Sequence, residues 1–372
     1  NARKRQLVKL CGNAFEAVRV FLEKLYLHKI RNIKEAVLSL NPRTNVIIGE
    51  NAAGKTTILE SIDILSRGRR FRTNKIDSLV KDGEKSLYIG ATLGDKKKKL
   101  EVDKGKNKTK ILIDGKEEKK QSKIAQEVAV QSIHPNSHAL IEGAPSERRA
   151  YLDWGLFHVE HDFKTEWSKY SKILRQRNEA LKNRSSEEIT WMRQLEPIGE
   201  KISSLRENYV NDLQKYIEIN QKYIMPDVEL KFSYEKGWDK NKSFLEALAE
   251  KRDTDLEKGY TGCGPQNADI KIIMNKKEAQ KICSRGQQKL IANIMLLSQS
   301  KDFFDKKKFP SIILVDDLSA ELTLEMQEKV LERLFETKSQ IFLTALNDSV
   351  LADILCEMDA NVFHVEHGEI TQ

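Results

Sequence analysis

The alternation of apolar and polar residues along the chain separates strand-like segments from helix-like ones. Apolar runs at Asn45–Ile48, Ile312–Val315 and Gln340–Ala345 predict buried strands, because a strand covered on both faces reads as a continuous apolar run. Residues 57–65 instead place apolar side chains at helical spacing, and residues 228–234 alternate between apolar and polar. The pattern therefore predicts an α/β fold.

The middle of the chain differs from both ends. Residues 151–259 are polar, have helical periodicity and contain all four tryptophans, which we expect to pack helices together rather than to stack on bases. Met225-Pro226-Asp227 predicts the end of a long helix, because proline cannot continue one. We interpret this region as an inserted arm. The predicted organisation is a basic amphipathic extension (1–24), the first part of a head domain (25–150), a helical arm (151–259) and the second part of the head (260–372).

The charge is unevenly distributed along the sequence. The 372 residues hold 64 Lys and Arg against 56 Asp and Glu, a formal net charge of +8. Residues 1–24, 66–76 and 94–123 carry +4, +5 and +6, which leaves −7 on the remainder. Basic patches on an acidic body indicate an anionic partner, nucleic acid first. For 94–123 taken alone, a solvated surface is an equally good interpretation.

Cysteine usage and hydropathy indicate a cytoplasmic protein. The four cysteines contain no CxxC pair and are too few for a disulfide framework in a chain of this length. No apolar run reaches the ~18 residues of a membrane span. Apolar positions within residues 1–24 follow helical spacing, which predicts an amphipathic helix that packs on the body, with a membrane-surface or partner role as the alternative.

The strongest chemical signal is the segment GENAAGKT at residues 49–56, which satisfies the pattern GxxxxGK[ST]. It lies between a predicted strand and a predicted helix, the order that a phosphate-binding P-loop needs, because backbone N–H groups and the helix N-terminus face the anion. Lys55 can then reach the β- and γ-phosphates, and the Thr56 hydroxyl can ligate Mg²⁺. The predicted ATP contacts in this segment are Gly49, Glu50, Asn51, Ala52, Ala53, Gly54, Lys55, Thr56 and Thr57.

A second acidic site follows the apolar run at Ile312–Val315. Asp316 and Asp317 stand at the carboxyl end of this predicted strand. We expect Asp316 to complete the Mg²⁺ shell with Thr56, and Asp317 to orient or deprotonate the attacking water. Lys55 and Asp317 are thus the predicted catalytic residues. A strand ending in two acids can also be a simple strand and turn, but the P-loop favours the Walker B interpretation.

Three observations indicate the class of P-loop protein. A GTPase needs the base-reading motif NKxD, and the nearest string, NKKE at 275–278, ends in Glu. Lys55 and Asp316 are 261 residues apart, a separation that suits an ABC-type head with an insertion. The string SRGQ at 284–287 precedes a predicted helix, and such a turn both caps a helix and binds phosphate. The predicted fold is therefore an ABC-type P-loop ATPase head of mixed sheet and helices, carrying an inserted, mainly helical arm.

Taken in order, these motifs resemble those of the RecF family, ATPases of bacterial recombinational repair. The resemblance runs from about Leu25 to the C-terminus and is far more specific than any single motif. SMC-type proteins share the ATPase motifs but not the middle blocks. The matching blocks are LYLHKIRN (25–32), GENAAGKTT (49–57), FRT (71–73), RRAYLDWG (148–155), RQRN (175–178), SRGQ (284–287) and DD (316–317).

The resemblance implies an ATP-dependent homodimer. Ser284, Gly286 and Gln287 would bind the γ-phosphate of the nucleotide held by the opposite subunit, and Thr344 would approach the same phosphate as a switch residue. The closed dimer would grip DNA near gaps or junctions of single- and double-stranded DNA, without sequence preference. It would cooperate with RecR and RecO to place RecA on DNA, with slow, DNA-dependent ATP hydrolysis.

The first candidates for DNA contact are the compact arginine group Arg67, Arg69, Arg70 and Arg72. The lysine-rich hairpin predicted around the Asp114-Gly115 turn is the second. The alternative is a nucleotide-binding DNA scaffold with little or no turnover. A P-loop head fused to a nuclease would need a further acidic metal cluster, and we expect no such domain to fit in this chain.

Four positions depart from the family pattern. Gln266 and Asn267 replace the His and Arg of GPHRAD, Thr323 stands where Asp is usual, and Asn136 stands where Glu is common. In the family these positions are close to dimer-facing loops. The departures therefore bear on subunit coupling or turnover rather than on nucleotide binding.

Overall fold

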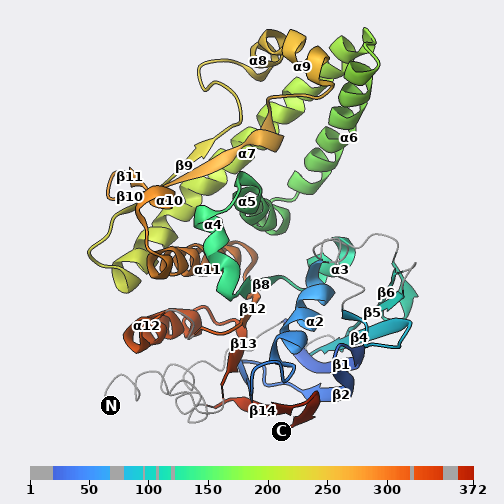
Figure 1. Cartoon of the computed structure of the whole chain (residues 1–372), viewed down its shortest axis with the longest axis vertical. Coiled ribbons are helices and arrows are strands. Elements are labelled where there is room, and N and C mark those ends of the chain that lie inside the picture. The colour runs from blue at the N-terminus through green and yellow to red at the C-terminus, as the bar shows by residue number, and fades with distance from the viewer. Residues whose placement is uncertain are drawn as a thin grey trace. The chain divides into compact units, whose positions relative to one another are not determined.

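The computed structural model describes residues 20–67, 79–94, 97–105, 109–118, 122–318, 322–346 and 359–372. The chain forms two compact units, Asn1–Ser137 with Phe303–Gln372, and His138–Asp302 (Figure 1). The second unit contains the predicted arm, and it extends beyond 151–259 on both sides to include the SRGQ turn.

The predicted N-terminal extension differs from the structure where the two overlap. Residues 1–19 lie outside the described residues. Residues 22–24, which we expected at the end of an amphipathic helix, begin strand β1 (Leu22–Ile30). The helical interpretation is wrong there. A short apolar stretch can form either a helix or a strand, and here the packing of the sheet, which buries Leu22, Leu25 and Leu27, favours the strand.

A six-stranded, mainly parallel sheet is the centre of the first unit. Its strands pair in parallel except for the antiparallel edge hairpin β14–β15. Its order is β15 (Glu369–Thr371), β14 (Asn361–Glu366), β3 (Thr44–Gly49), β13 (Gln340–Ala345), β12 (Ile312–Val315) and β8 (Val130–Ile133). Strands β3, β12 and β13 are buried throughout, which confirms the three strands predicted from apolar runs.

The other sheet of the first unit is antiparallel. Its order is β2 (Ile33–Ser39), β1, β4 (Ser86–Leu93), β5 (Lys99–Gly105), β6 (Thr109–Ile113) and β7 (Lys116–Glu117). Asp114 and Gly115 join the last two strands with φ of 51° and 75°, which confirms the predicted Asp-Gly hairpin turn.

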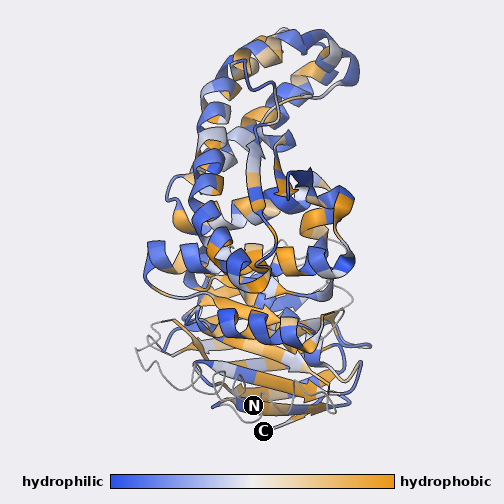
Figure 2. Cartoon of the chain, turned by 90° about the vertical axis from the view of Figure 1, so that its left-hand side faces the viewer, coloured by the Kyte–Doolittle hydropathy of each residue, from blue (hydrophilic) through white to orange (hydrophobic). Residues whose placement is uncertain are grey.

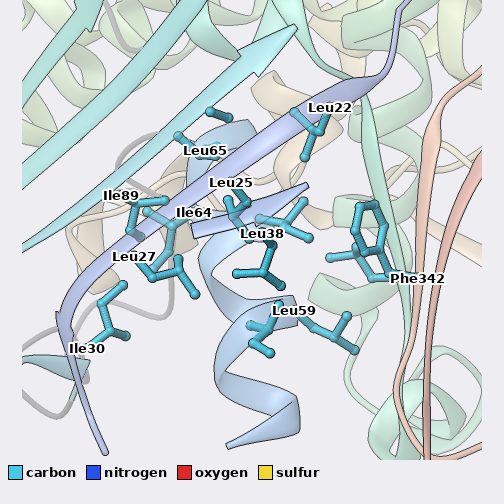
Figure 3. Close-up of a cluster of buried hydrophobic side chains, with 14 of the residues drawn as sticks. Leu22, Leu25, Leu27, Ile30, Leu38, Leu59, Ile64, Leu65, Ile89 and Phe342 are labelled. Atoms are coloured by element: carbon cyan, nitrogen blue, oxygen red, sulfur yellow. The ribbon is translucent and has the colours of Figure 1, made fainter. Parts of the chain in front are cut away.

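Helix α2 (Lys55–Arg67) is packed into the core of this unit. Side chains from β1, α2 and β13 point toward one another, among them Leu27, Leu59, Leu65 and Phe342 (Figure 3). Burial of these apolar side chains anchors the helix whose N-terminus follows the P-loop. The unit also contains α3 (Ser122–Glu127) and α12 (Leu324–Phe335).

The second unit is mainly helical. Figure 2 shows that its helices are largely hydrophilic, with apolar residues interspersed. Its elements are α4 (Ala139–Glu142), α5 (Pro145–Val159), α6 (Phe163–Lys182), α7 (Glu187–Ile224), β9 (Leu230–Glu235), α8 (Phe244–Glu250), α9 (Arg252–Lys258), β10 (Asp269–Met274), β11 (Lys277–Glu278), α10 (Ala279–Ile282) and α11 (Arg285–Lys307), whose residues from Phe303 on are counted with the first unit. Helix α7 ends directly before Met225-Pro226, and β9 pairs with β10, as the sequence predicted.

Aromatic and arginine side chains pack this unit. Trp167 stacks between Phe163 and Tyr170, with ring centroids 6.4 and 5.7 Å apart, and the Arg206 guanidinium lies 4.8 Å from the Trp167 ring. Trp238 stacks on an aromatic neighbour in the same way. These two tryptophans therefore pack within the unit, as predicted.

The arginines of the RRAYLDWG block are structural. Buried Arg148 donates to both carboxylate oxygens of Asp269, at 2.6 and 2.9 Å, and Arg149 donates to the Ala268 carbonyl at 2.8 Å. Arg206 joins Asp153 of the same block to the Pro265 carbonyl. Bidentate, charge-assisted hydrogen bonds of this kind hold the loop before β10 against α5 and α7.

Candidate functional site

The P-loop connects β3 to α2, as predicted. Ala52 and Gly54 adopt left-handed backbone conformations, with φ of 63° and 126°. A Cβ at Gly54 would also meet the Asn32 amide at 3.1 Å, so both conformation and space favour glycine here. This tight loop places Lys55 and Thr56 in the first turn of α2.

The Lys55 ammonium lies over its own loop. Its Nζ donates to the carbonyl oxygens of Gly49 and Glu50, at 2.7 and 2.8 Å. Burial lowers the pKa of Lys55, and the nearby carboxylates of Asp316 and Asp317 oppose that shift. The cation is therefore held at the mouth of the loop, close to the acid pair.

The acid pair follows β12 beside the end of β13. Parallel pairing of Val315 with Leu343 brings Asp316 and Thr344 to the same edge of the sheet. The Thr344 hydroxyl donates to Asp316 Oδ1 at 2.8 Å and accepts the Asp317 backbone N–H at 2.9 Å. The Asp317 backbone is left-handed, with a φ of 49°. The Thr344 hydroxyl therefore has two effects: it orients the Asp316 carboxylate, and it stabilises this unusual backbone conformation of Asp317.

The predicted metal ligands meet across the pocket. The Thr56 hydroxyl donates to Asp316 Oδ2 at 3.0 Å, although the two residues are 260 positions apart. Among the described residues, no group of three His, Cys, Asp or Glu could hold a metal ion. One hydroxyl and one carboxylate fit Mg²⁺, which typically takes few protein ligands and completes its shell with phosphates and water.

These groups line one pocket of about 570 Å³. Many of the residues that line the pocket were predicted from the sequence. Several others that line it were not assigned to the site by the sequence. The lining residues are Arg31, Asn32, Glu50, Asn51, Ala52, Gly54, Lys55, Thr56, Thr57, Pro135, Asp316, Asp317, Thr344, Ala345 and Leu346. Gly49 and Ala53 support the loop from outside this lining.

Two turns from distant parts of the first unit hold the P-loop. Asn32, between β1 and β2, donates its amide to the Ala53 carbonyl at 2.6 Å. Gly368, between β14 and β15, donates its backbone N–H to the same oxygen at 3.0 Å. In the sequence, the Arg31-Asn32 pair is recognisable only by its resemblance to the family. The Gly368 contact has no sequence signal, because it depends on the position of the edge hairpin beside the loop.

The signature turn belongs to the second unit. Ser284 Oγ accepts the Gln287 N–H at 3.3 Å, and Gln287 Oε1 accepts the Ser284 N–H at 2.9 Å. This reciprocal capping box starts α11 and confirms the predicted helix start. Ser284 is exposed, and Gly286 is half-buried in the first turn.

The predicted DNA-contact residues are mostly outside the described part of the chain. Arg67 ends α2, whereas Arg69, Arg70 and Arg72 lie outside the described residues. In the lysine-rich region, three described lysines form ion pairs with acids. These pairs are Lys97–Glu23 at 2.7 Å, Lys98–Glu127 at 2.6 Å and Lys123–Glu118 at 2.8 Å. Part of the predicted positive charge of this region is therefore compensated locally.

Three of the departures from the family pattern have local structural roles. Thr323 caps α12 by accepting the Met326 N–H at 3.4 Å, a role that Asp can also fill. Gln266 accepts the Tyr170 hydroxyl at 2.5 Å and donates to the Cys263 carbonyl at 2.8 Å. The Asn267 amide donates to the Gly262 carbonyl at 3.0 Å. Both amides therefore stabilise the loop before β10.

Comparisons with known proteins agree with this geometry. The chain matches the model of the RecF/RecN/SMC N terminal domain family over residues 21–371. It is 34% identical to the DNA replication and repair protein RecF of Shewanella sediminis, over 94% of this chain and 99% of that protein. The RecF protein of Stutzerimonas stutzeri is 33% identical, over 94% of this chain and 97% of that protein.

Solved structures show the same relationship. A structure of the recombination mediator protein RecF with ATP in the RecFOR pathway has a TM-score of 0.84 at 25% identity, over 96% of this chain and 99% of that one. The Smc head domain of Pyrococcus furiosus bound to the C-terminal domain of ScpA has a TM-score of 0.58 at 15% identity, over 95% of each chain, which shows a shared fold.

Among the described residues, no helix is long and apolar enough to cross a membrane. The P-loop and the acid pair occur in the first unit, an α/β head of the ABC and SMC type, and the signature turn occurs in the mainly helical second unit. Together with the matches over nearly the whole chain, they show that this protein belongs to the RecF family of DNA replication and repair proteins.

Proposed function

We propose that the chain binds ATP and Mg²⁺ in the P-loop pocket and uses the nucleotide to control its grip on DNA during recombinational repair. The observation that carries the proposal is the convergence of Lys55, Thr56 and Asp316 on one pocket. These residues supply a cation for the phosphates and an oxygen pair for the metal. The solved RecF structure with ATP supports the same choice of ligand.

The protein residues have distinct roles in this proposal. Bound Mg²⁺ would supply positive charge to the phosphates, with Thr56 and Asp316 as its protein ligands. When ATP binds, the Lys55 ammonium would release the carbonyl oxygens of Gly49 and Glu50 and donate hydrogen bonds to phosphate oxygens instead. Loop N–H groups from Asn51 to Thr57 and the positive end of α2 stabilise the remaining negative charge.

Hydrolysis would depend on Asp317. Its carboxylate lines the pocket beside Asp316 and can accept a proton from an attacking water. Aspartate is one methylene shorter than the glutamate common in ABC ATPases, so we expect weak turnover. The resemblance to the family implies that this turnover depends on DNA.

The signature turn would act between two subunits. Ser284 is exposed, and its Oγ only accepts in the capping box, so its O–H remains able to donate to a phosphate. Together with Gly286 and Gln287 it would bind the nucleotide of a second copy. ATP would then drive formation of a homodimer that closes on DNA.

Family membership supports the cellular role. We propose action in the cytoplasm near gaps or single- to double-stranded junctions, with RecR and RecO as partners and RecA as the protein finally placed on DNA. Contacts would be mainly to phosphates, with Arg67, Arg69, Arg70 and Arg72 as candidates.

A DNA scaffold with little or no turnover is the second candidate. The observation that favours it is Gln266, whose amide is engaged with Tyr170 and Cys263 where the family has a histidine. The Gln266 amide is held by these two contacts and, unlike a histidine, offers no titratable group at this position for coupling subunits or assisting turnover.

The experiment is duplex DNA binding as a function of salt, with ATP, with ADP and without nucleotide, for the wild type and Lys55→Arg. We expect ATP to tighten DNA binding by the wild type only. Arginine keeps the charge but its planar fork cannot replace a compact ammonium. Equal DNA affinity in all nucleotide states would contradict ATP control and favour the scaffold.

A further inference from the structure

Helix α6 has two faces of different chemistry. Phe163, Tyr170, Ala180 and Leu181 are buried, and they line the side of the helix that packs within the unit. The opposite side is fully polar. We define the outer α6 stripe as the exposed residues Thr165, Ser168, Lys169, Lys172 and Arg175. The stripe ends there, because exposed Glu179, the next residue on this side, is acidic and pairs with Lys182 at 3.0 Å.

The spacing of the stripe makes it continuous. Its members follow one another at intervals of three, one, three and three residues, which places them on one side of an α-helix. At ~1.5 Å rise per residue the stripe is about 15 Å long. Helix α6 as a whole carries six basic and two acidic residues, whereas α7 carries five basic and seven acidic residues. The arm thus concentrates positive charge on one helix.

The charge of the stripe is little compensated. Lys169 is 56% exposed and lies 3.5 Å from Glu166, which forms a shorter contact of 3.2 Å with Lys201. Lys172 and Arg175 form no ion pair with any residue in the described part of the chain. The lysine-rich hairpin region is mixed: Lys97, Lys98 and Lys123 form ion pairs, whereas Lys110 and Lys116 of the hairpin itself form none with the described residues.

We propose that the outer α6 stripe is a contact surface for the phosphate backbone of DNA, an inference that rests on the DNA binding proposed above. Ammonium, guanidinium and hydroxyl groups are the donors that proteins commonly direct at phosphates. Because each DNA strand carries a phosphate every ~3.4 Å of axis, a stripe of about 15 Å spans several of them.

A protein partner fits the stripe less well. Interfaces between proteins need a desolvated centre, usually with aromatic or large apolar anchors. Of the large hydrophobic residues exposed in the described part of the chain, none is on α6. A face of cations and hydroxyls without such an anchor binds by charge and hydrogen bonding, which is how phosphate backbones are recognised.

The test compares two double variants with the same change in charge. Lys172→Glu with Arg175→Glu alters the stripe, and Lys222→Glu with Lys240→Glu alters exposed lysines elsewhere in the second unit. Binding of a labelled random-sequence duplex is measured over a series of salt concentrations. We expect the stripe variant to lose about tenfold or more in affinity, with a log–log salt slope reduced by about two, because two phosphate contacts are lost.

The matched control separates a local contact from general charge repulsion, and thermal melting checks that both variants fold. The inference is overturned if the wild type binds DNA and the stripe variant binds it as the control does. A wild type that does not bind duplex DNA at all would overturn the proposed function together with the stripe. Unchanged DNA affinity with lost binding of an acidic protein would assign the stripe to a protein partner instead.

Discussion

At the scale of single residues, Thr344 shows how tertiary contacts refine a predicted role. The sequence placed it near the γ-phosphate as a switch residue. In the structure its side chain is 2% exposed, and its hydroxyl is used by Asp316 and by the Asp317 backbone. We therefore propose that Thr344 positions the acid pair. Its hydroxyl donates a hydrogen bond to the Asp316 carboxylate and accepts one from the Asp317 backbone N–H.

The variants Thr344→Val and Thr344→Ser test this role. Valine keeps the shape but removes the hydroxyl, so Asp316 and Asp317 each lose a hydrogen bond worth about 1 kcal/mol or more. We expect kcat for ATP hydrolysis to fall about tenfold while KM changes little, and serine to restore most of the rate. A large loss of ATP affinity with valine would instead indicate direct contact with the phosphate.

At the scale of elements, the P-loop is held by two turns far from it in sequence. Asn32 and Gly368 both donate to the Ala53 carbonyl. A Cβ at Gly368 would meet the Asn32 carbonyl oxygen at 2.4 Å, so the two turns are also in close contact with each other. The edge hairpin β14–β15 is therefore part of the support for the nucleotide site.

The variant Gly368→Ala tests that support, with Gly115→Ala as its control. Both glycines have left-handed φ, at 86° and 75°, but a Cβ at Gly115 would meet nothing within 4 Å. Backbone strain should cost each variant about 1 kcal/mol in the free energy of unfolding, and Gly368→Ala should lose more because its Cβ also meets the Asn32 carbonyl. Isothermal titration with ATP should show weaker binding for Gly368→Ala alone. Equal affinities in the two variants would argue against a role of the hairpin in the site.

At the scale of the whole molecule, the two halves of the proposed ATP site lie in different units. The P-loop and acid pair belong to the first unit, and the signature turn belongs to the second. Each is locally complete: the pocket has its own hydrogen bonds, and the turn is a capping box. Two copies of the chain would be required for the arrangement that the family resemblance implies.

Light scattering of Asp317→Asn with ATP tests dimer formation. Asparagine keeps the size of the side chain and removes the proton acceptor, so bound ATP should persist and a dimer should accumulate. The same variant with Ser284→Ala should remain monomeric, because the donor from the second copy is lost. A monomer in the Asp317→Asn variant with saturating ATP would show that this mechanism is wrong.

The sequence by itself determined the P-loop, the acid pair, the helix start at SRGQ and the main strands. Each of these can be recognised from residues close together in the sequence: an apolar run, a spacing of glycines or a capping pattern. Tertiary structure alone decided the contacts of Asn32, Gly368 and Thr344, the beginning of β1 at Leu22, and the pairing of Lys97, Lys98 and Lys123 with acids. These features depend on which strands lie side by side and which faces become buried. They are contacts between residues far apart in the sequence, so no local pattern of residues predicts them.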